Sequence, residues 1–458
     1  MAELNVWMNG SLVGVWFALR SGTPGFRYRP QWRDSPQGRV LSLSLPFTAS
    51  LEHRGEVVTN YFDNLLPESV DIRRRLRARF GARSIDVFDL LTAIGRDCVG
   101  AVQLLPPEAT PQGWNRVECE PLTEAGVARV LASATSASPL APGEEQDFRI
   151  SIAGAQEKTA LVRMGGKWYR PRGATPTTHI LKLPLGLVGN LRADMTDSVE
   201  NEWLCAQLMG RLGIQMADTE MARFGERKVL VVKRFDRRWQ GIDEAAEERP
   251  GFKMPARAWI ARLPQEDLCQ ALGVAPGRKY QPDGGPSMAD CLRLLAESEQ
   301  AEADRGLFVL AQFAFWLLAA TDGHAKNFSI HHRRAGRFAL TRLYDVISAW
   351  PIIGTGPSKL PYERAKLAMG VPGSTVHYRL RDIQPRHWKA LAQRCGPGLW
   401  DRIVAMAESV EAVLGRVQPL LPQRFPSRIW TPISSGMRRH AQRFLRAAAA
   451  AQMSSRRR

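Results

Sequence analysis

Residues 307–327 have the sequence LFVLAQFAFWLLAATDGHAKN, in which a mainly apolar run of 14 residues, 307–320, is followed by a polar turn. A membrane-spanning helix needs about 20 apolar residues, so this run predicts a buried helix of a globular core. The helix is expected to end where the chain turns at Gly323. Two polar side chains, Asp322 and Asn327, then lie five positions apart on one loop.

A short hairpin and a third polar side chain follow this loop. Residues 328–331 and 338–344 have strand patterns on either side of Ala335-Gly336, and Asp345 comes next. This order is typical of a phosphotransferase. The Asp322 carboxylate would orient a hydroxyl and accept its proton. Asn327 and Asp345 offer the oxygen ligands that Mg²⁺ prefers, and Lys326 is placed to contact the transferred phosphoryl group. An Asp-Gly pair alone is typical of an ordinary turn, so the prediction depends on the ordered set.

Two upstream segments offer positive charge and backbone donors for phosphate. Lys182 lies in an alternating strand pattern, 178–184, where an apolar setting demands a partner. Glu202, or else Glu200, in the helical pattern 199–212 would provide it; a lysine snorkelling from an edge strand is the alternative. Residues 151–159, SIAGAQEKT, form a small-residue turn whose N–H groups can bind phosphate. Because this turn has one glycine, an ordinary hairpin turn is the alternative.

The rest of the chain predicts an α+β fold of several parts. Its 458 residues, 44% apolar and 24% charged, exclude wholesale disorder, collagen and a coiled-coil rod. Asn9-Gly10 between two apolar runs predicts a hairpin, and alternation predicts a further strand at 41–46. Helices are expected at 67–80 and after Ser84. Further strand patterns occupy 149–152, 159–163 and 228–235, and from about residue 236 the pattern is mainly helical, apart from one hairpin. The small, polar, Pro-containing segment 132–143 predicts a linker.

Charge and cysteine content narrow the setting. The formal net charge is +18, and ten arginines but no acidic residue follow Glu411. Such a charge attracts polyanions, which can be phosphates, nucleic acid or an acidic partner surface. The basic tail could touch DNA phosphates, or it could be only a solvated basic helix. Six scattered cysteines without a CxxC pair favour reduced, structural thiols rather than a zinc or dithiol site. The N-terminus lacks the basic region of a signal peptide. A cytoplasmic protein without a membrane span is therefore expected.

Together these segments resemble the HipA family, the toxin kinases of bacterial toxin–antitoxin pairs. The resemblance is carried by residues 60–68, 95–103, 151–159, 178–184, 199–205, 231–237, 262–270, 321–329 and 343–348. It implies a two-lobed, protein-kinase-like fold with an extra β-rich N-terminal subdomain. The implied parts are the subdomain at 1–105, a connecting segment with the linker at 106–146, a small lobe at 147–236, and a helical large lobe with the basic tail at 237–458.

The resemblance also implies a function for each site residue. Asp322 would be the catalytic base of an ATP- and Mg²⁺-dependent serine/threonine protein kinase, with Lys326 beside it. Asn327 and Asp345 would be the metal ligands, and Ser151 would be the autophosphorylated serine that switches the enzyme off. The implied nucleotide-binding residues are the phosphate loop Ala153, Gly154, Ala155, Gln156, Glu157 and Lys158, then Lys182, Glu202, the hinge Lys233, Arg234 and Phe235, and His324.

The implied partners follow the family. They are a HipB-like helix-turn-helix antitoxin, operator DNA bound through that antitoxin, and a protein substrate for which glutamyl-tRNA synthetase is the family's best-known example. A bacterial protein associated with the nucleoid when bound to its antitoxin is expected. Ordinary kinases have Asp-Phe-Gly where this chain has Asp345-Val346-Ile347, which speaks against a phosphorylated activation loop. Two alternatives stay open: a small-molecule phosphotransferase of the same fold, and a catalytically silent DNA-binding corepressor.

Overall fold

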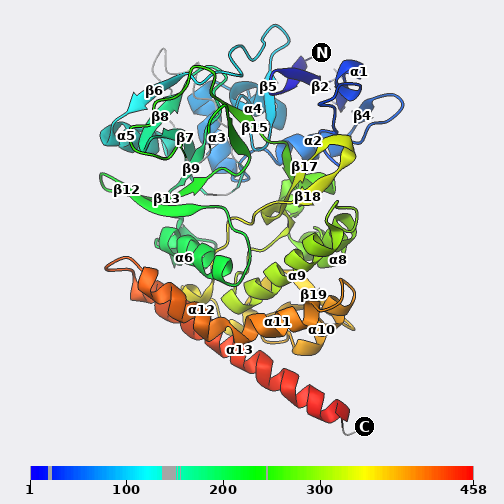
Figure 1. Ribbon diagram of the computed structural model, residues 1–458, viewed down its shortest axis with the longest axis vertical. Helices are drawn as coiled ribbons and strands as arrows, with labels where there is room; N and C mark the ends of the chain where they lie inside the picture. The colour runs from blue at the N-terminus through cyan, green and yellow to red at the C-terminus, as the bar shows by residue number, and fades with distance from the viewer. Residues whose placement is uncertain are drawn as a thin grey trace. The chain divides into compact units, whose positions relative to one another are not determined.

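The computed structural model describes residues 2–18, 23–136, 151, 153, 154, 156–243 and 246–456. They form two compact units that alternate along the chain. Unit 1 comprises Met1–Leu183, Glu220–Gly277 and Ser329–Phe338, and unit 2 comprises Pro184–Thr219, Arg278–Phe328 and Ala339–Arg458. Both combine helices with antiparallel strands (Figure 1), which confirms the predicted α+β class. The domain boundaries expected after residues 105, 146 and 236 stay predictions.

The first sheet of unit 1 has five strands in the order β4-β3-β2-β1-β5. The predicted hairpin is confirmed, because Asn9 and Gly10 adopt the positive φ angles, 45° and 82°, that a tight hairpin turn requires. Trp16 stacks on Phe62 of helix α2 with ring centroids 4.0 Å apart, in a core of aromatic and aliphatic side chains. The elements are β1 (Ala2–Met8), β2 (Ser11–Ala18), β3 (Pro24–Tyr28), α1 (Pro30–Arg33), β4 (Glu52–Arg54), α2 (Glu56–Asp63), α3 (Val70–Phe80), α4 (Val87–Ile94) and β5 (Val102–Leu105).

A second sheet of unit 1 has six strands in the order β12-β13-β9-β7-β8-β6. Helix α5 packs against this sheet. Its Val127, Val130 and Leu131 belong to one buried hydrophobic cluster with Leu161 and Leu181 of the sheet. The strands predicted at 159–163, 178–184 and 228–235 are confirmed. The elements are β6 (Cys119–Leu122), α5 (Glu124–Ala134), β7 (Lys158–Met164), β8 (Lys167–Pro171), β9 (His179–Lys182), β12 (Thr219–Phe224) and β13 (Arg227–Lys233). Most of the predicted linker at 132–143 and strand at 149–152 lies outside the described residues.

The strand predicted at 41–46 is wrong, since this segment is a series of turns. Its alternation has another cause. Leu41 and Leu45 are buried in the core of the first sheet. The hydroxyls of Ser42 and Ser44 both donate to the carbonyl of Gln270, at 3.2 and 2.7 Å. A loop held between two neighbours therefore shows the same period of two as a strand. The helix predicted from residue 67 begins later, at Val70, because Pro67 forms a bridge with Gly154 and Ser69 caps the helix.

The second half is also less helical than predicted, because five short strands beyond residue 236 were missed. They are β14 (Arg237–Gln240), β15 (Trp259–Arg262), β16 (Gln265–Asp267), β19 (Lys366–Pro372) and β20 (Val376–Arg379). Most have only three or four residues, too few to establish a period. In β14 an arginine, Arg237, takes one of the buried positions, so the hydrophobic alternation is broken. The predicted hairpin after Phe328 is present as β17 (Ser329–His332) and β18 (Phe338–Leu340).

Unit 2 is built around the apolar helix predicted from the opening stretch, α9 (Ala301–Leu318), which is almost wholly buried. Its Trp316 stacks on His440 of the long helix α13 (Ser427–Arg456), with centroids 4.3 Å apart. The other elements are β10 (Gly186–Val188), β11 (Ala193–Met195), α6 (Ser198–Arg211), α8 (Met288–Leu295), α10 (Pro385–Gln393), α11 (Leu399–Glu408) and α12 (Val410–Val417).

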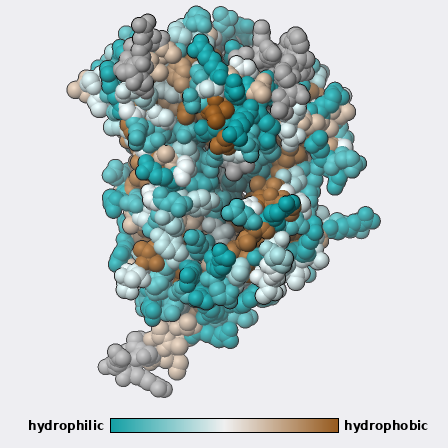
Figure 2. All heavy atoms as spheres, turned by 180° about the vertical axis from the view of Figure 1, so that it is seen from behind, coloured by the Kyte–Doolittle hydropathy of each residue, from teal (hydrophilic) through white to brown (hydrophobic). Residues whose placement is uncertain are grey.

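The hydropathy of the surface and the burial of the cysteines are those expected of a globular protein. One face of the molecule is mostly hydrophilic, with small separate hydrophobic patches (Figure 2). Among the described helices, none combines the length and apolar character needed to cross a membrane. All six cysteines are free thiols, and five of them are buried, as the reduced, structural interpretation predicts.

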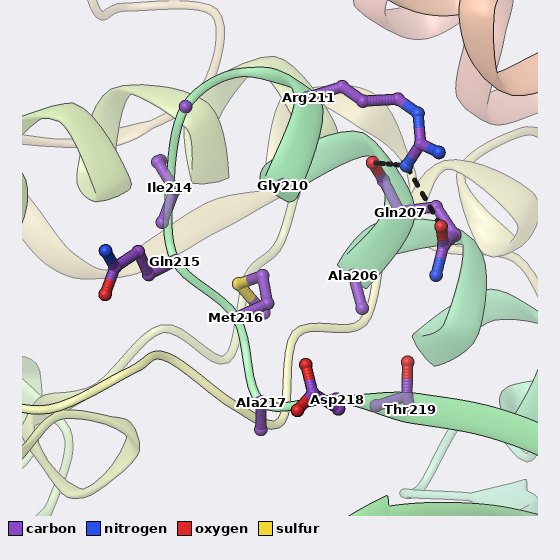
Figure 3. A pocket seen from close by; sticks show the side chains of 11 residues that line it. Ala206, Gln207, Gly210, Arg211, Ile214, Gln215, Met216, Ala217, Asp218 and Thr219 are labelled. Carbon is purple, nitrogen blue, oxygen red and sulfur yellow. Dashed lines mark hydrogen bonds between the residues drawn. The ribbon is translucent and has the colours of Figure 1, made fainter. Parts of the chain in front are cut away.

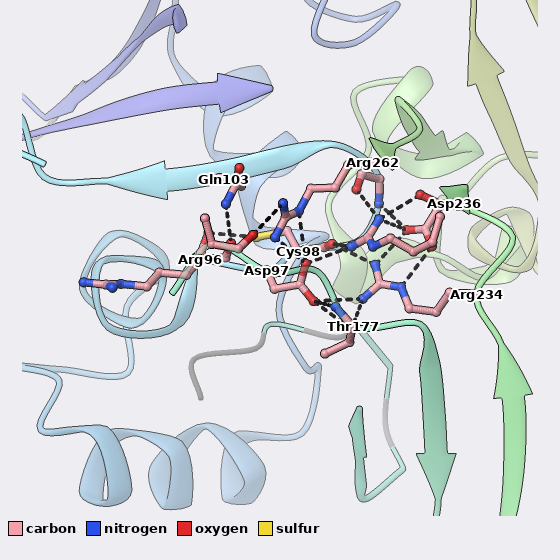
Figure 4. Close-up of polar contacts among 12 residues, drawn as sticks. Arg96, Asp97, Cys98, Gln103, Thr177, Arg234, Asp236 and Arg262 are labelled. Atoms are coloured by element: carbon pink, nitrogen blue, oxygen red, sulfur yellow. Dashed lines mark hydrogen bonds and ion pairs between the residues drawn. The ribbon is translucent and has the colours of Figure 1, made fainter. Parts of the chain in front are cut away.

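The most concentrated charge in unit 1 is fully internal. Here we call Arg234, Arg237, Arg262, Asp97 and Asp236 the arginine–aspartate cluster; their side chains are between 1% and 7% exposed. Figure 4 shows Asp97 and Asp236 enclosed by the guanidinium groups. Asp97 accepts from all three arginines at 3.0 to 3.3 Å and from the Thr177 hydroxyl at 2.7 Å. Backbone carbonyls of residues 98, 100 and 174 accept further guanidinium protons.

Electrostatics keep the cluster ionised. Burial by itself raises the pKa of the Asp97 carboxyl, but the three guanidinium groups outweigh burial and hold that pKa well below its ordinary value. The pKa of Asp236 is lowered to about 2 for the same reason. Three positive and two negative side chains leave one excess positive charge, which the carbonyl acceptors stabilise. A buried charge without such partners would be strongly destabilising.

Replacing Asp97 by Asn should therefore destabilise unit 1 severely. Asp97→Asn leaves three buried guanidinium groups facing one carboxylate, and we expect the free energy of unfolding to fall by about 3–5 kcal/mol. Urea denaturation followed by tryptophan fluorescence measures the change. Asp71→Asn removes the same charge from a side chain that is 75% exposed and should be close to neutral. Equal stabilities of the two variants would contradict the importance of the cluster.

Candidate active site

The loop that follows α9 is shaped by close packing. Ala319 ends the helix in the left-handed conformation, with φ 48°. A Cβ atom at Gly323 would lie 2.3 Å from the ring of Phe315, so only glycine allows the loop to lie against the helix. The side-chain amide of Gln312 donates to the Gly323 carbonyl at 3.3 Å. The buried helix thus fixes the turn that carries Asp322.

Asp322 is the exposed member of this loop, with 56% of its side chain open to solvent. The hydroxyl of Tyr280 donates to its Oδ1, and Nε2 of His324 lies 3.7 Å from the same oxygen. Surrounding protein raises the pKa of the Asp322 carboxyl, while the Lys279 ammonium and the Tyr280 hydrogen bond oppose this shift. Because more than half of the side chain is exposed, solvent limits the shift. The carboxylate is open enough to meet a substrate hydroxyl.

Asn327 is buried and oriented by its own loop. Its Nδ2 donates to the Asp322 carbonyl at 2.8 Å and lies 3.5 Å from the Asp345 carbonyl. The nitrogen side of the amide is therefore turned toward backbone oxygens, and the amide oxygen faces the other way, as a metal ligand requires. Lys326 is buried beside it, and the Tyr344 hydroxyl donates to the Lys326 carbonyl at 3.1 Å.

Asp345 occupies a strained, firmly held backbone. Its φ of 61° is in the left-handed region, which costs a residue with a side chain of this kind about 1–3 kcal/mol and persists only where neighbours enforce it. Two residues earlier, Leu343 exchanges backbone hydrogen bonds with Gln215 and Ala217, at 2.9 and 2.7 Å. Three residues later, Ser348 exchanges two hydrogen bonds with the buried amide of Asn201, at 2.8 and 2.9 Å. The segment is pinned on both sides.

The first of these anchors borders a cavity. Figure 3 shows Gln207 and Arg211 of α6 together with the segment 214–219, which leads into β12, around this pocket of about 460 Å³. The lining contains none of the predicted site residues. Two residues of its wall, Gln215 and Ala217, pair with Leu343, so it is their backbone and not the cavity that holds the Asp345 segment.

Unit 1 gathers positive charge around the predicted phosphate loop. Lys182 of β9 is buried, and its register partner on β7 is Lys158. Side chains of register partners lie on the same face of a sheet, so two lysines stand side by side. The Lys158 ammonium donates to the Ala153 carbonyl at the start of the loop. Lys158 and Lys182, both among the predicted nucleotide-binding residues, thus share one face of the sheet, which suits an anion such as phosphate.

The predicted phosphate loop is attached to the N-terminal part of the chain. The Glu68 N–H donates to the Gly154 carbonyl at 3.3 Å, and Glu157 forms an ion pair with Arg75 of α3. The Gln156 amide donates to the Leu183 carbonyl, next to Lys182. Ala155 lies outside the described residues. Ser151 is fully buried: its hydroxyl donates to the Leu65 carbonyl at 2.7 Å, and its N–H donates to the Asp97 carbonyl at 3.1 Å.

The predicted hinge residues have structural partners of their own. The Lys233 ammonium contacts Glu247 and Glu248 at 3.0 and 2.5 Å, and Arg234 belongs to the arginine–aspartate cluster. The Phe235 ring meets the His331 ring edge-on, with centroids 5.8 Å apart. An adenine contact would therefore use their backbone, as predicted, rather than their side chains.

Within unit 2 the structure brings Asp322, His324, Asn327 and Asp345 together around one loop, with Tyr280 added. Within unit 1 it brings together Lys158, Lys182 and the described loop residues 153, 154, 156 and 157. Glu200 and Glu202 are both buried on α6 of unit 2.

Sequence reasoning missed Tyr280 and Asn201. Tyr280 lies 42 positions from Asp322, outside any spacing motif. Asn201 offered one signal, a polar residue between two glutamates in a helix with little exposed surface. Among the described residues, no group of three His, Cys, Asp or Glu forms a metal site, and a magnesium held by two side chains and a nucleotide needs none.

Comparison with known proteins shows which fold and which family this chain has. The fold matches that of HipA from Shewanella oneidensis MR-1, in a complex with HipB and operator DNA, over 96% of this chain and 97% of that one, with a TM-score of 0.75 and 21% identity. The predicted protein-kinase-like fold is confirmed. The family descriptions "HipA N-terminal domain" and "HipA-like C-terminal domain" match residues 4–105 and 150–420. The chain belongs to the HipA family.

Two curated relatives support this assignment over most of their length. A Sinorhizobium fredii (strain NGR234) protein named "Putative kinase Y4mE" is 34% identical, covering 90% of this chain and 91% of the relative. The "Serine/threonine-protein kinase toxin HipA" of Shewanella oneidensis is 26% identical, covering 72% and 71%. The relatives are thus named as kinases, in agreement with the chemistry predicted from the loop.

Asn201→Leu should loosen the Asp345 segment without changing the helix that carries it. Leucine has a similar volume but leaves the buried N–H and C=O of Ser348 without partners, which costs about 1–3 kcal/mol for each group. Hydrogen exchange of residues 343–348, measured by mass spectrometry, should become faster. Gln207→Leu, on the same helix, removes only a contact with Arg211 and should leave that exchange unchanged. Unaltered exchange in Asn201→Leu would show that the amide does not hold the segment.

Proposed function

We propose that this protein is an ATP- and Mg²⁺-dependent serine/threonine protein kinase that acts as the toxin of a type II toxin–antitoxin system. The observation that carries the proposal is the loop of unit 2, where an open carboxylate at Asp322 adjoins an oriented amide at Asn327 and the held segment of Asp345. The expected substrate is a translation protein, with glutamyl-tRNA synthetase as the first candidate. Its phosphorylation would arrest growth.

The residues divide the chemistry among them. Asp322 orients the substrate hydroxyl and accepts its proton. Asn327 and Asp345 would hold Mg²⁺, which supplies positive charge against the phosphates when it is bound. Lys158, Lys182 and the backbone of residues 153–157 bind the nucleotide phosphates, and Lys326 and His324 lie next to the base. Glu202, or else Glu200, is the partner that the sequence indicates for Lys182, and the backbone of residues 233–235 would contact the adenine.

The proposed partners are a HipB-like helix-turn-helix antitoxin and operator DNA. In the complex with both, the protein would also act as a corepressor at the nucleoid. The family membership and the assembly of the solved relative support this. The basic tail contributes less than its charge suggests, since Arg438 pairs with Glu411 and Arg443 donates to Tyr362 and three backbone carbonyls. The exposed Arg416 and Arg424 are better placed for phosphates.

Asp322→Asn should lower the rate of phosphoryl transfer to a small residual value. The amide keeps the shape of the side chain but cannot accept the hydroxyl proton, and loss of a general base lowers rates about 10²–10⁴-fold. The measurement is transfer of ³²P from labelled ATP to proteins of a bacterial lysate, together with growth after induction. Asp382→Asn, the same change at a side chain that is 46% exposed, should leave both unchanged.

The same assay separates the competing functions. One labelled protein band supports a protein kinase, whereas label confined to small metabolites would point to a small-molecule phosphotransferase. An Asp322→Asn protein as toxic as the wild type would remove catalysis from the explanation. Wild-type protein without Mg²⁺-dependent ATP binding in calorimetry would leave the silent corepressor.

Ser151 is proposed as the autophosphorylated residue, and its burial defines how the switch works. A hydroxyl with no exposed surface cannot receive a phosphoryl group in place, so the loop must first leave Leu65 and Asp97. A phosphate with about two negative charges could not return to that buried position. The modified loop would stay released and could no longer bind ATP.

Incubation of wild-type protein with ATP and Mg²⁺ should therefore add the mass of one phosphate, and Ser151→Ala should prevent it. Limited proteolysis should cut the phosphorylated protein faster within residues 136–158, because the released loop is accessible. Ser50→Ala, at an exposed serine, should behave like the wild type. A mass increase that persists in Ser151→Ala would assign the modification to another residue.

A further inference from the structure

Tyr280 makes the most direct side-chain contact with the proposed base. Its phenolic hydroxyl donates to Oδ1 of Asp322. Both residues belong to unit 2, but neither the sequence pattern nor the reaction proposed above gives Tyr280 any part. A tyrosine at this place has to be explained, because a carboxylate that accepts a substrate proton must keep one oxygen accessible.

The backbone presents Tyr280 on a compact turn. The N–H groups of Asp283 and Gly285 both donate to the Tyr280 carbonyl, at 3.0 and 2.9 Å. A Cβ at Gly285 would lie 2.1 Å from the Arg278 carbonyl, so the turn closes only with glycine there. The next residue, Gln281, accepts from the Gly370 N–H of β19 at 2.9 Å. The tyrosine is therefore attached to the fold at its base.

The ring is held as well as the backbone. It meets the ring of His324 edge-on, with centroids 5.1 Å apart, and the Lys279 ammonium lies 5.3 Å from its centroid. His324 is buried within the loop of Asp322. The hydroxyl is thus aimed at the carboxylate by contacts that do not depend on the hydrogen bond itself.

Asp322 needs such a partner. A carboxylate offers two oxygens and about four acceptor positions, and this one is 56% exposed on a loop. Rotation about its terminal torsion is broad and costs little. A general base works when a further group fixes its orientation toward the nucleophile. One hydrogen bond to Oδ1 fixes the carboxylate plane and leaves Oδ2 for the substrate hydroxyl.

We propose that Tyr280 is a positioning residue for Asp322: its hydroxyl holds Oδ1 so that Oδ2 is presented to the substrate hydroxyl. The proposal rests on the kinase function argued above and adds a residue to it. Tyr280 does not touch the transferred group. It acts by keeping the base in the productive orientation, an effect expected in turnover rather than in substrate binding.

Tyr280→Phe tests this in the full-length protein. The variant keeps the ring, its contact with His324 and its approach to Lys279, and loses only the hydroxyl. Hydrogen bonds to charged groups are strong enough to predict a fall of about ten- to a hundredfold in kcat, with KM for ATP and for the protein substrate unchanged. Tyr362→Phe, which removes a hydroxyl bonded to His440 in the same unit, should keep the wild-type kcat. Melting temperatures of the two variants identify any loss of folding.

A double-mutant cycle keeps the test independent of folding. In the Asp322→Asn background, Tyr280→Phe should change the residual rate less than twofold, because Tyr280 acts through Asp322. A full additional loss in that background would overturn the proposal. A faster Tyr280→Phe enzyme with lower KM for the protein substrate would also overturn it, since the hydroxyl would then compete with the substrate.

The outcomes also separate this proposal from the function on which it rests. An active wild type whose Tyr280→Phe variant keeps the same kcat would reject the positioning effect and leave the kinase assignment intact. A wild type without phosphoryl transfer would reject both.

Discussion

Unit 1 depends on three buried guanidinium groups sharing two carboxylates. The groups come from distant stretches of chain: Asp97 from the N-terminal subdomain, Arg234, Asp236 and Arg237 from the end of β13 and the start of β14, and Arg262 from β15. Each charge would be costly inside a protein by itself, and their mutual pairing is what makes burial possible. Such a cluster adds little net stability compared with apolar packing, but it allows few other arrangements. The pairing therefore favours the arrangement of the N-terminal subdomain and the six-stranded sheet in which all five side chains meet.

The proposed phosphate loop begins at this fixed point and is itself held weakly. The Asp97 carbonyl accepts from the Ser151 N–H, and Asp97 also accepts from Thr177, so one residue joins the cluster, the strand before Lys182 and the loop. Beyond Ser151, the described residues of the loop are attached by hydrogen bonds to Glu68 and Leu183 and by the Arg75–Glu157 ion pair, which is partly exposed and of modest strength. A rigid base with a weakly attached loop is what a switch by phosphorylation requires, because the loop can leave without disturbing the cluster.

Local chemistry decided which parts the sequence could predict. Asn9-Gly10 predicted a hairpin since few residue pairs accept two positive φ angles, and the apolar stretch before Asp322 predicted the buried helix α9 since its 14 residues are too few for a membrane span. The ordered spacing of Asp322, Asn327 and Asp345 predicted the loop of unit 2, because all three are set by consecutive elements. The prediction of a strand at 41–46 was wrong, because contacts with two different neighbours alternate along this loop with the period of a strand. Arg234 was taken for a hinge residue alone, because its partner Asp97 lies 137 positions away and no local pattern records that pairing.

Tyr280 and Asn201 show the same limit at the site itself. Both act on predicted residues, yet each reaches its partner through the fold: Tyr280 through a turn closed at Gly285, and Asn201 across to Ser348, 147 positions later. Spacing motifs identify the groups that contact a substrate, since a short loop must carry them in order. The groups that orient those residues have no such constraint, because any element passing nearby can supply them. The proposed base, which is 56% exposed, and the Asp345 segment, which has a left-handed backbone, are both held in place by residues that no motif contains. The precision of this site therefore comes from its surroundings as much as from its signature.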